Sequence, residues 1–130
     1  YDAIKNGDWG NDFIKKPKKQ MRSIWAINTP SNGEKKYGKH PTQKPEALLE
    51  RIIIASSNEG DIVLDPFCGS ATTGVVTLRH NRKFVGIELE QEYLDTFAIP
   101  RIKDVFCQND LFTFNKTDES VVKEKCSSLP

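Results

Sequence analysis

The sequence lacks the features that mark several large classes of protein. No apolar run approaches the ~18 residues of a membrane span, and residues 1–5 have no signal-peptide pattern. There is no initiator Met at position 1, so we expect a piece of a longer product. The three cysteines are too widely spaced for a zinc site, and His40 and His80 have no companions at ligand spacing, so we predict no metal site. These absences favour a cytoplasmic protein without a membrane partner.

Composition and charge describe an ordinary small domain with an uneven charge distribution. The 130 residues are 37% hydrophobic and 28% charged, as in a soluble globular protein. Residues 1–51 carry 11 Lys/Arg against 6 Asp/Glu (+5), and residues 52–130 carry 8 against 12 (−4), which gives the net +1. The densest basic cluster falls within residues 15–22. It predicts either a solvated loop or contact with phosphates.

Hydrophobic periodicity predicts an α/β chain. Residues 21–27 alternate as a strand does, and Trp25 within them is either core or a base-stacking platform. A helix is expected to begin with Pro45 as its first residue and to end at residues 57–60. The following expected elements are a buried strand at 61–65, a turn at 66–71, a helix at 72–79, a strand at 83–88 and a helix starting at 92–97. Helices alternating with strands predict a parallel βαβ core.

Two carboxylates close the two adjacent predicted strands of this core. Asp65 ends the first strand, Glu88 ends the second, and a turn with Gly69 and Ser70 lies between them. Ligands of doubly wound sheets bind at such strand ends, where turn N–H groups attract an anion and the second acid can accept ribose hydroxyls. The glycine spacing fits neither a P-loop nor a dinucleotide fingerprint, which disfavours a dehydrogenase. Two interpretations of this pattern remain. The turn could bind a nucleoside that carries an amino acid, whose ammonium would pair with Asp65, or it could be a plain structural turn.

Three segments together resemble one enzyme family. Residues 38–45 (GKHPTQKP), 65–73 (DPFCGSATT) and 86–89 (GIEL, followed by Tyr93) are similar, in order and spacing, to motifs of amino-type DNA methyltransferases, and the resemblance covers residues 21–99. These enzymes transfer a methyl group from S-adenosylmethionine to adenine N6 or cytosine N4. The resemblance implies a partial, Rossmann-like class I methyltransferase fold with an incomplete sheet. It also implies double-stranded DNA as a partner, bound through a missing N-terminal part and residues 15–22.

The resemblance assigns roles only to residues that match the family motifs. Phe67 would pack near the adenine or sulfonium, Gly69 would allow close backbone approach, and Glu88 would hold the ribose hydroxyls. The remaining expected cofactor-binding residues are Thr42 and Lys44 at the methionine carboxylate, Asp65 near the polar groups, and Ser70, Thr72 and Thr73 along the methionine end. No catalytic residue is assigned.

Several of these residues also have plainer interpretations. Phe67 could belong to the core, Lys44 could be solvated, and Thr42 could cap the following helix. His40 is expected to shape a turn rather than touch a ligand, and Glu88 could be a surface carboxylate.

The chain also departs from the family. Ala71 stands where the family has Gly, and a positive φ there would cost roughly 1–2 kcal/mol. Pro100 falls where the family's helix continues, so we expect the helix to end or kink. No Pro-Pro pair is present, although the family holds its flipped target base with a Pro-Pro-aromatic motif.

These observations leave three hypotheses. The chain is an enzyme fragment that is inactive alone, a subunit complemented by a chain carrying the missing motif, or a decayed relic. We expect residues 1–37 to be the end of a target-recognition region, 38–114 to be the cofactor-binding subdomain, and 115–130 to be a disordered polar tail. Adenine is favoured over cytosine by resemblance alone.

Overall fold

The computed structural model describes residues 24–113, with side chains up to Gln108. The basic residues 15–22 and the tail at 115–130 lie outside the described residues. The described elements, in chain order, are η1 (Gly33–Lys35), α2 (Glu46–Ser56), β1 (Ile62–Asp65), α3 (Thr72–Arg79), β2 (Lys83–Gly86), α4 (Gln91–Tyr93), η2 (Leu94–Ala98) and α5 (Ile99–Thr113).

The two strands form a parallel pair joined through α3. Ile62 pairs with Lys83, and Asp65 pairs with Gly86 at the carboxyl end. Hydrogen bonding continues past this end, because the Ile87 N–H donates to the Asp65 carbonyl oxygen at 2.9 Å. The predicted α/β class, the parallel βαβ core and the incomplete sheet are therefore confirmed, with two strands in the described part.

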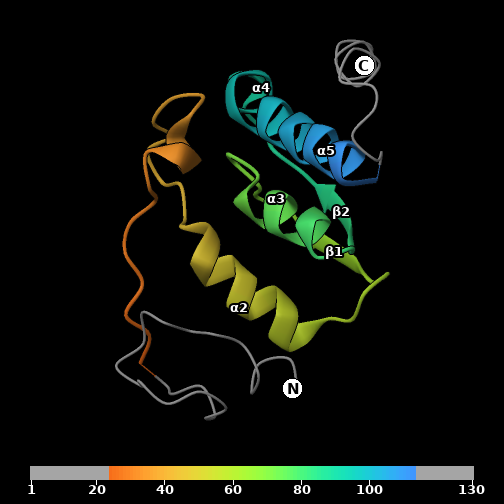
Figure 1. The fold of residues 1–130 in the computed structure, drawn as a ribbon. Helices are drawn as coiled ribbons and strands as arrows, with labels where there is room; N and C mark the ends of the chain where they lie inside the picture. The colour runs from red at the N-terminus through yellow and green to blue at the C-terminus, as the bar shows by residue number, and fades with distance from the viewer. Residues whose placement is uncertain (1–23, 114–130) are drawn as a thin grey trace.

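The longer helices lie side by side, with α3 between α2 and α5 (Figure 1). Helix α3 contacts both strands, and Gly74 at its centre allows the close approach. A Cβ at Gly74 would lie 2.5 Å from Phe84 Cε1 and 2.8 Å from Ile102 Cδ1. The core is made by the buried side chains of Ile53, Cys68, Ala71, Val75, Val76, Ala98 and Val105.

One expectation for β1 is wrong, because this strand is not buried on both faces. Ile62, Leu64, Val85 and Ile87 are 48–68% exposed, whereas Phe84 lies against α3 and α5. Side chains alternate between the two faces of a strand, so these four apolar residues share the face opposite α3. The physical reason is that nothing in the described residues covers this face.

Helix α2 begins one residue later than predicted. Pro45 is its N-cap, in extended conformation, rather than its first helical residue. The free Glu46 N–H donates to Glu34 Oε2 at 2.8 Å, so a side chain from the η1 segment caps the helix. Thr42 therefore does not cap α2, and that interpretation of Thr42 is wrong.

Two further expectations need correction. Of the two outcomes expected at Pro100, an end of the helix is wrong, because Pro100 is the second residue of α5 and follows the π-helical turn η2; a kink there stays a prediction. A π turn changes the register of the backbone acceptors, which accommodates a residue that has no N–H and whose ring needs space. Residues 24–27 form no strand, because no neighbouring strand pairs with them in the described part of the chain.

No helix within residues 24–113 has the length and apolar character required to cross a membrane.

The close contact at Gly74 gives a test of the packing. We expect Gly74→Ala to lower the free energy of unfolding, because overpacking costs about 1–3 kcal/mol and outweighs the gain of up to about 1 kcal/mol in helix propensity. Gly33→Ala is the control, since its nearest atom would be Ser31 Oγ at 3.8 Å. Urea denaturation measures both, and equal stability of the two variants would contradict the packing.

Candidate functional site

The two predicted acids lie at the same edge of the sheet. Asp65 ends β1, and Glu88 lies two residues beyond the end of β2. The turn between β1 and α3 bridges them, because the Gly69 N–H donates to Glu88 Oε2 at 2.8 Å. Glu88 therefore does not close the strand itself, but the predicted juxtaposition of strand tips and turn is present.

Glu88 is held by the backbone around it. Besides Gly69, the N–H groups of Leu89 and Glu90 donate to Oε1 at 2.9 and 3.1 Å. Hydrogen bonds from Glu90 and Gly69 stabilise the charged form and lower the pKa of Glu88 below its ordinary value. A carboxylate has about four acceptor positions, so about one remains for a further donor such as a hydroxyl group.

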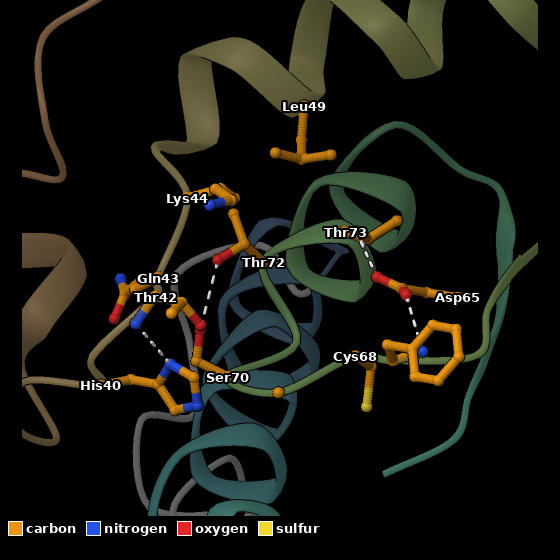
Figure 2. Close-up of a pocket in the computed structure, with 12 residues that line it drawn as sticks. His40, Thr42, Gln43, Lys44, Leu49, Asp65, Cys68, Ser70, Thr72 and Thr73 are labelled. Carbon is orange, nitrogen blue, oxygen red and sulfur yellow. Dashed lines mark hydrogen bonds between the residues drawn. The ribbon is translucent and has the colours of Figure 1, made fainter.

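Asp65 fixes the shape of the turn. Its Oδ1 accepts the Phe67 N–H at 3.1 Å, and its Oδ2 accepts the Thr73 hydroxyl at 2.6 Å (Figure 2). Thr73 thus donates to Asp65 rather than pointing freely into the site. The Phe67 ring is 88% exposed, so it does not belong to the core, and that interpretation is wrong.

A polar cavity of about 150 Å³ lies between this turn and the segment before α2. It is smaller than the roughly 300–1,000 Å³ typical of pockets that enclose a whole ligand. Eight of the nine predicted cofactor-binding residues line it, all except Glu88: Thr42, Lys44, Asp65, Phe67, Gly69, Ser70, Thr72 and Thr73. Thr42 and Lys44 are exposed on one side of the cavity, across from the start of α3 (Figure 2).

His40 also lines the cavity, as a buried residue that shapes the turn. Its Nδ1 accepts the Thr42 N–H at 3.3 Å, and its ring meets Tyr93 and Phe97 edge to face. Burial lowers the pKa of His40, and Gly69 leaves room for the ring, since a Cβ there would lie 3.2 Å from His40 Cε1. The expected role in the turn agrees with these contacts.

Sequence reasoning did not select three other lining residues: Gln43, Leu49 and Cys68. Gln43 Nε2 donates to the Glu34 carbonyl oxygen at 2.8 Å, so it anchors the segment before α2. Burial raises the pKa of the Cys68 thiol. The only available signal for Gln43 and Cys68 was their position inside the two matching motifs.

The departure at Ala71 falls on a left-handed residue. Ala71 has φ 54° and ψ 37° and is buried as the N-cap of α3. The condition under which an alanine costs roughly 1–2 kcal/mol is therefore met. The chain nevertheless adopts the tight turn into α3.

Within residues 24–113, no group of three or more His, Cys, Asp or Glu side chains could hold a metal ion.

Parallel strands, one acid at the end of β1, another just beyond β2 and a glycine turn between the strands are features of a partial class I methyltransferase fold. The DNA methylase family matches residues 2–99, three quarters of the chain. The chain belongs to this family.

Three relatives illustrate the similarity and its extent. The chain is 60% identical over 76 residues to the type II methyltransferase M2.DpnII of Streptococcus pneumoniae, which covers 58% of this chain and 28% of the relative. It is 69% identical over 58 residues to the DNA adenine methyltransferase YhdJ of Escherichia coli K12, covering 45% and 20%. The solved structure of the cytosine-N4-specific PvuII DNA methyltransferase superposes with a TM-score of 0.52 at 28% identity, covering 80% and 36%. The chain thus spans at most about a third of these relatives.

The hydrogen bonds to Glu88 predict a pH dependence of stability. A folded-state pKa below the unfolded-state value means that the carboxylate stabilises the fold above about pH 4.3, the ordinary value, and that this contribution is lost as the pH falls. We expect Glu88→Gln to have a lower free energy of unfolding than the unaltered chain at neutral pH. This difference in stability should become smaller as the pH falls. Urea midpoints between about pH 7 and pH 3 measure it.

The exposed Glu59, in the loop before β1, is the control for this comparison. Glu59→Gln should follow the unaltered chain at every pH. If the difference in stability between Glu88→Gln and the unaltered chain stays constant down to acidic pH, the charge of the Glu88 carboxylate does not stabilise the turn.

Proposed function

We propose that this chain is the cofactor-binding part of a DNA methyltransferase that transfers a methyl group from S-adenosylmethionine to an exocyclic base amine. Adenine N6 is the favoured target, because the E. coli relative, which is 69% identical over 58 residues, is named an adenine methyltransferase. Cytosine N4, the target in the name of the PvuII enzyme, is the alternative. We propose the cytoplasm as the location of this activity, because DNA is the proposed substrate.

The observation that carries the proposal is the edge where β1 and β2 end. The Gly69 N–H joins the turn to Glu88, and Asp65 holds the other side of the same turn. A nucleoside can rest its ribose on Glu88 while its charged tail enters the cavity behind the turn. The cavity size supports this division, since it accommodates the tail and leaves the nucleoside on the open surface.

The chemical character of the lining matches the charges of the methionine tail. Lys44 and the hydroxyls of Ser70 and Thr72 can bind its carboxylate, and Asp65 can bind its ammonium. The exposed Phe67 ring offers an apolar surface to the adenine or sulfonium region. The bound cofactor would supply an activated methyl group, whereas these residues would bind and orient it.

Calorimetric titration with S-adenosylmethionine tests the binding step. We expect saturable binding by the full chain, loss of affinity in Glu88→Ala through the ribose, and unchanged affinity in Glu59→Ala. Absence of heat up to about 1 mM, the upper end of usual substrate affinities, would contradict the proposal and favour the decayed relic.

We further propose that methylation requires residues this sequence does not contain. The sequence has no Pro-Pro pair to hold a target base, and the face of Ile62, Leu64, Val85 and Ile87 is open to solvent. Contiguous exposed apolar surface marks an interaction site in soluble proteins. The rest of a methyltransferase fold, from upstream sequence or a complementing chain, would cover this face and carry the base-holding motif.

Complementation tests this requirement. The chain is co-expressed with the part of S. pneumoniae M2.DpnII outside the matched region, and transfer of labelled methyl groups to double-stranded DNA is measured. We expect activity from the pair and from neither part alone, and its loss in Leu64→Asp, with Glu59→Asp as the surface control. Methylation by this chain alone would contradict the requirement, and an inactive pair would contradict complementation by this face.

A further inference from the structure

We propose that Arg101 is a positioning residue, which orients the hydroxyls of Ser70 and Thr72 toward the carboxylate of the bound cofactor. This inference rests on the proposed function. Arg101 belongs to α5 and lies two residues beyond the end of the family match at residue 99. It does not line the cavity, so it would act through its neighbours.

The guanidinium of Arg101 is buried against the turn. The residue is 6% exposed, and Nη1 donates to the Ser70 carbonyl oxygen at 2.7 Å, to Ser70 Oγ at 3.2 Å and to Thr72 Oγ1 at 3.0 Å. Nη2 donates to Glu46 Oε1 at 2.8 Å. The Arg101 side chain thus links three segments: α5, the turn and the first residue of α2. The turn forms one side of the cavity, and the segment that leads into α2 forms the other.

The direction of these bonds determines what the hydroxyls can offer. Arginine only donates, so Ser70 Oγ and Thr72 Oγ1 both accept from Arg101, and each keeps its own hydrogen to donate. The two oxygens are 3.4 Å apart, so one hydrogen can lie between them (Figure 2). The other hydrogen is left to point elsewhere, and both residues line the cavity. Arg101 therefore turns this corner of the cavity into a hydroxyl donor, which suits an anion.

Glu46 balances the charge of Arg101 and also pairs with a second arginine. Removal of Arg101 therefore does not leave Glu46 as an unpaired, partly buried ion. Glu46 Oε1 binds Arg101, and Glu46 Oε2 binds Arg79 from α3. In Arg101→Met, Glu46 would retain Arg79 as its partner, and the apolar chain would fill much of the same volume. Arg101→Lys retains the charge with fewer donors.

Two adenosine ligands, one with the amino-acid tail and one without it, test this role. The full chain and its variants are titrated calorimetrically with S-adenosylmethionine and with 5′-methylthioadenosine, a neutral thioether that lacks the whole aminocarboxypropyl group and therefore the carboxylate, the ammonium and the charge on sulfur. We expect Arg101→Met to lose about tenfold in affinity for S-adenosylmethionine, the value of a charge-assisted hydrogen bond, with unchanged affinity for methylthioadenosine. Arg101→Lys should restore part of the difference.

Arg82→Met is the matched control. Arg82 donates in a similar way to Ser57 and to the His80 carbonyl oxygen, near the far end of α3. It should leave both affinities unchanged. Equal losses for both ligands in Arg101→Met, or full affinity for both, would overturn the role of Arg101. Absence of binding by the unaltered chain would instead overturn the proposed function on which the inference depends.

Discussion

The parallel pairing of β1 with β2 is the constraint on which the rest of the structure depends. It continues past the strand ends, where the Cys68 N–H donates to the Ile87 carbonyl oxygen at 2.9 Å and the Gly69 N–H donates to Glu88. The turn is thereby joined to the second strand before α3 begins. An isolated pair of strands is marginally stable, so α3 stabilises the site by covering one face of the pair, and α2 and α5 pack against α3.

Local patterns predicted most elements because the forces that form them act over short distances. Helix α3 has the predicted bounds, Thr72–Arg79, because an apolar stripe and a glycine turn define it. Whether a face of a strand is buried depends instead on residues that are distant in the sequence or belong to another chain. The apolar run at 62–64 is typical of a strand buried on both faces, yet Ile62 and Leu64 are exposed. Their composition fits a larger sheet than the described one.

The placement of the motif residues around one cavity follows from local patterns, whereas the tertiary contacts that hold them do not. Asp65 and Glu88 meet at one edge because parallel strands bring their carboxyl ends together. The Glu34 side chain that caps α2 and the Arg101 side chain that holds the turn come from distant segments. No local sequence pattern marks either side chain, so the residues they contact can be identified only in the folded structure. The role of each motif residue in binding remains a prediction.

The two departures from the family do not by themselves favour a relic. Ala71 takes a left-handed conformation, and the carbonyl oxygen of the residue before it accepts from Arg101, which holds the turn in place. Pro100 follows a π turn that lets α5 continue to Thr113. Strained residues persist where surrounding structure determines their conformation. Both departures are therefore compatible with a formed turn and a continuous α5, and they do not separate a decayed relic from a cofactor-binding chain.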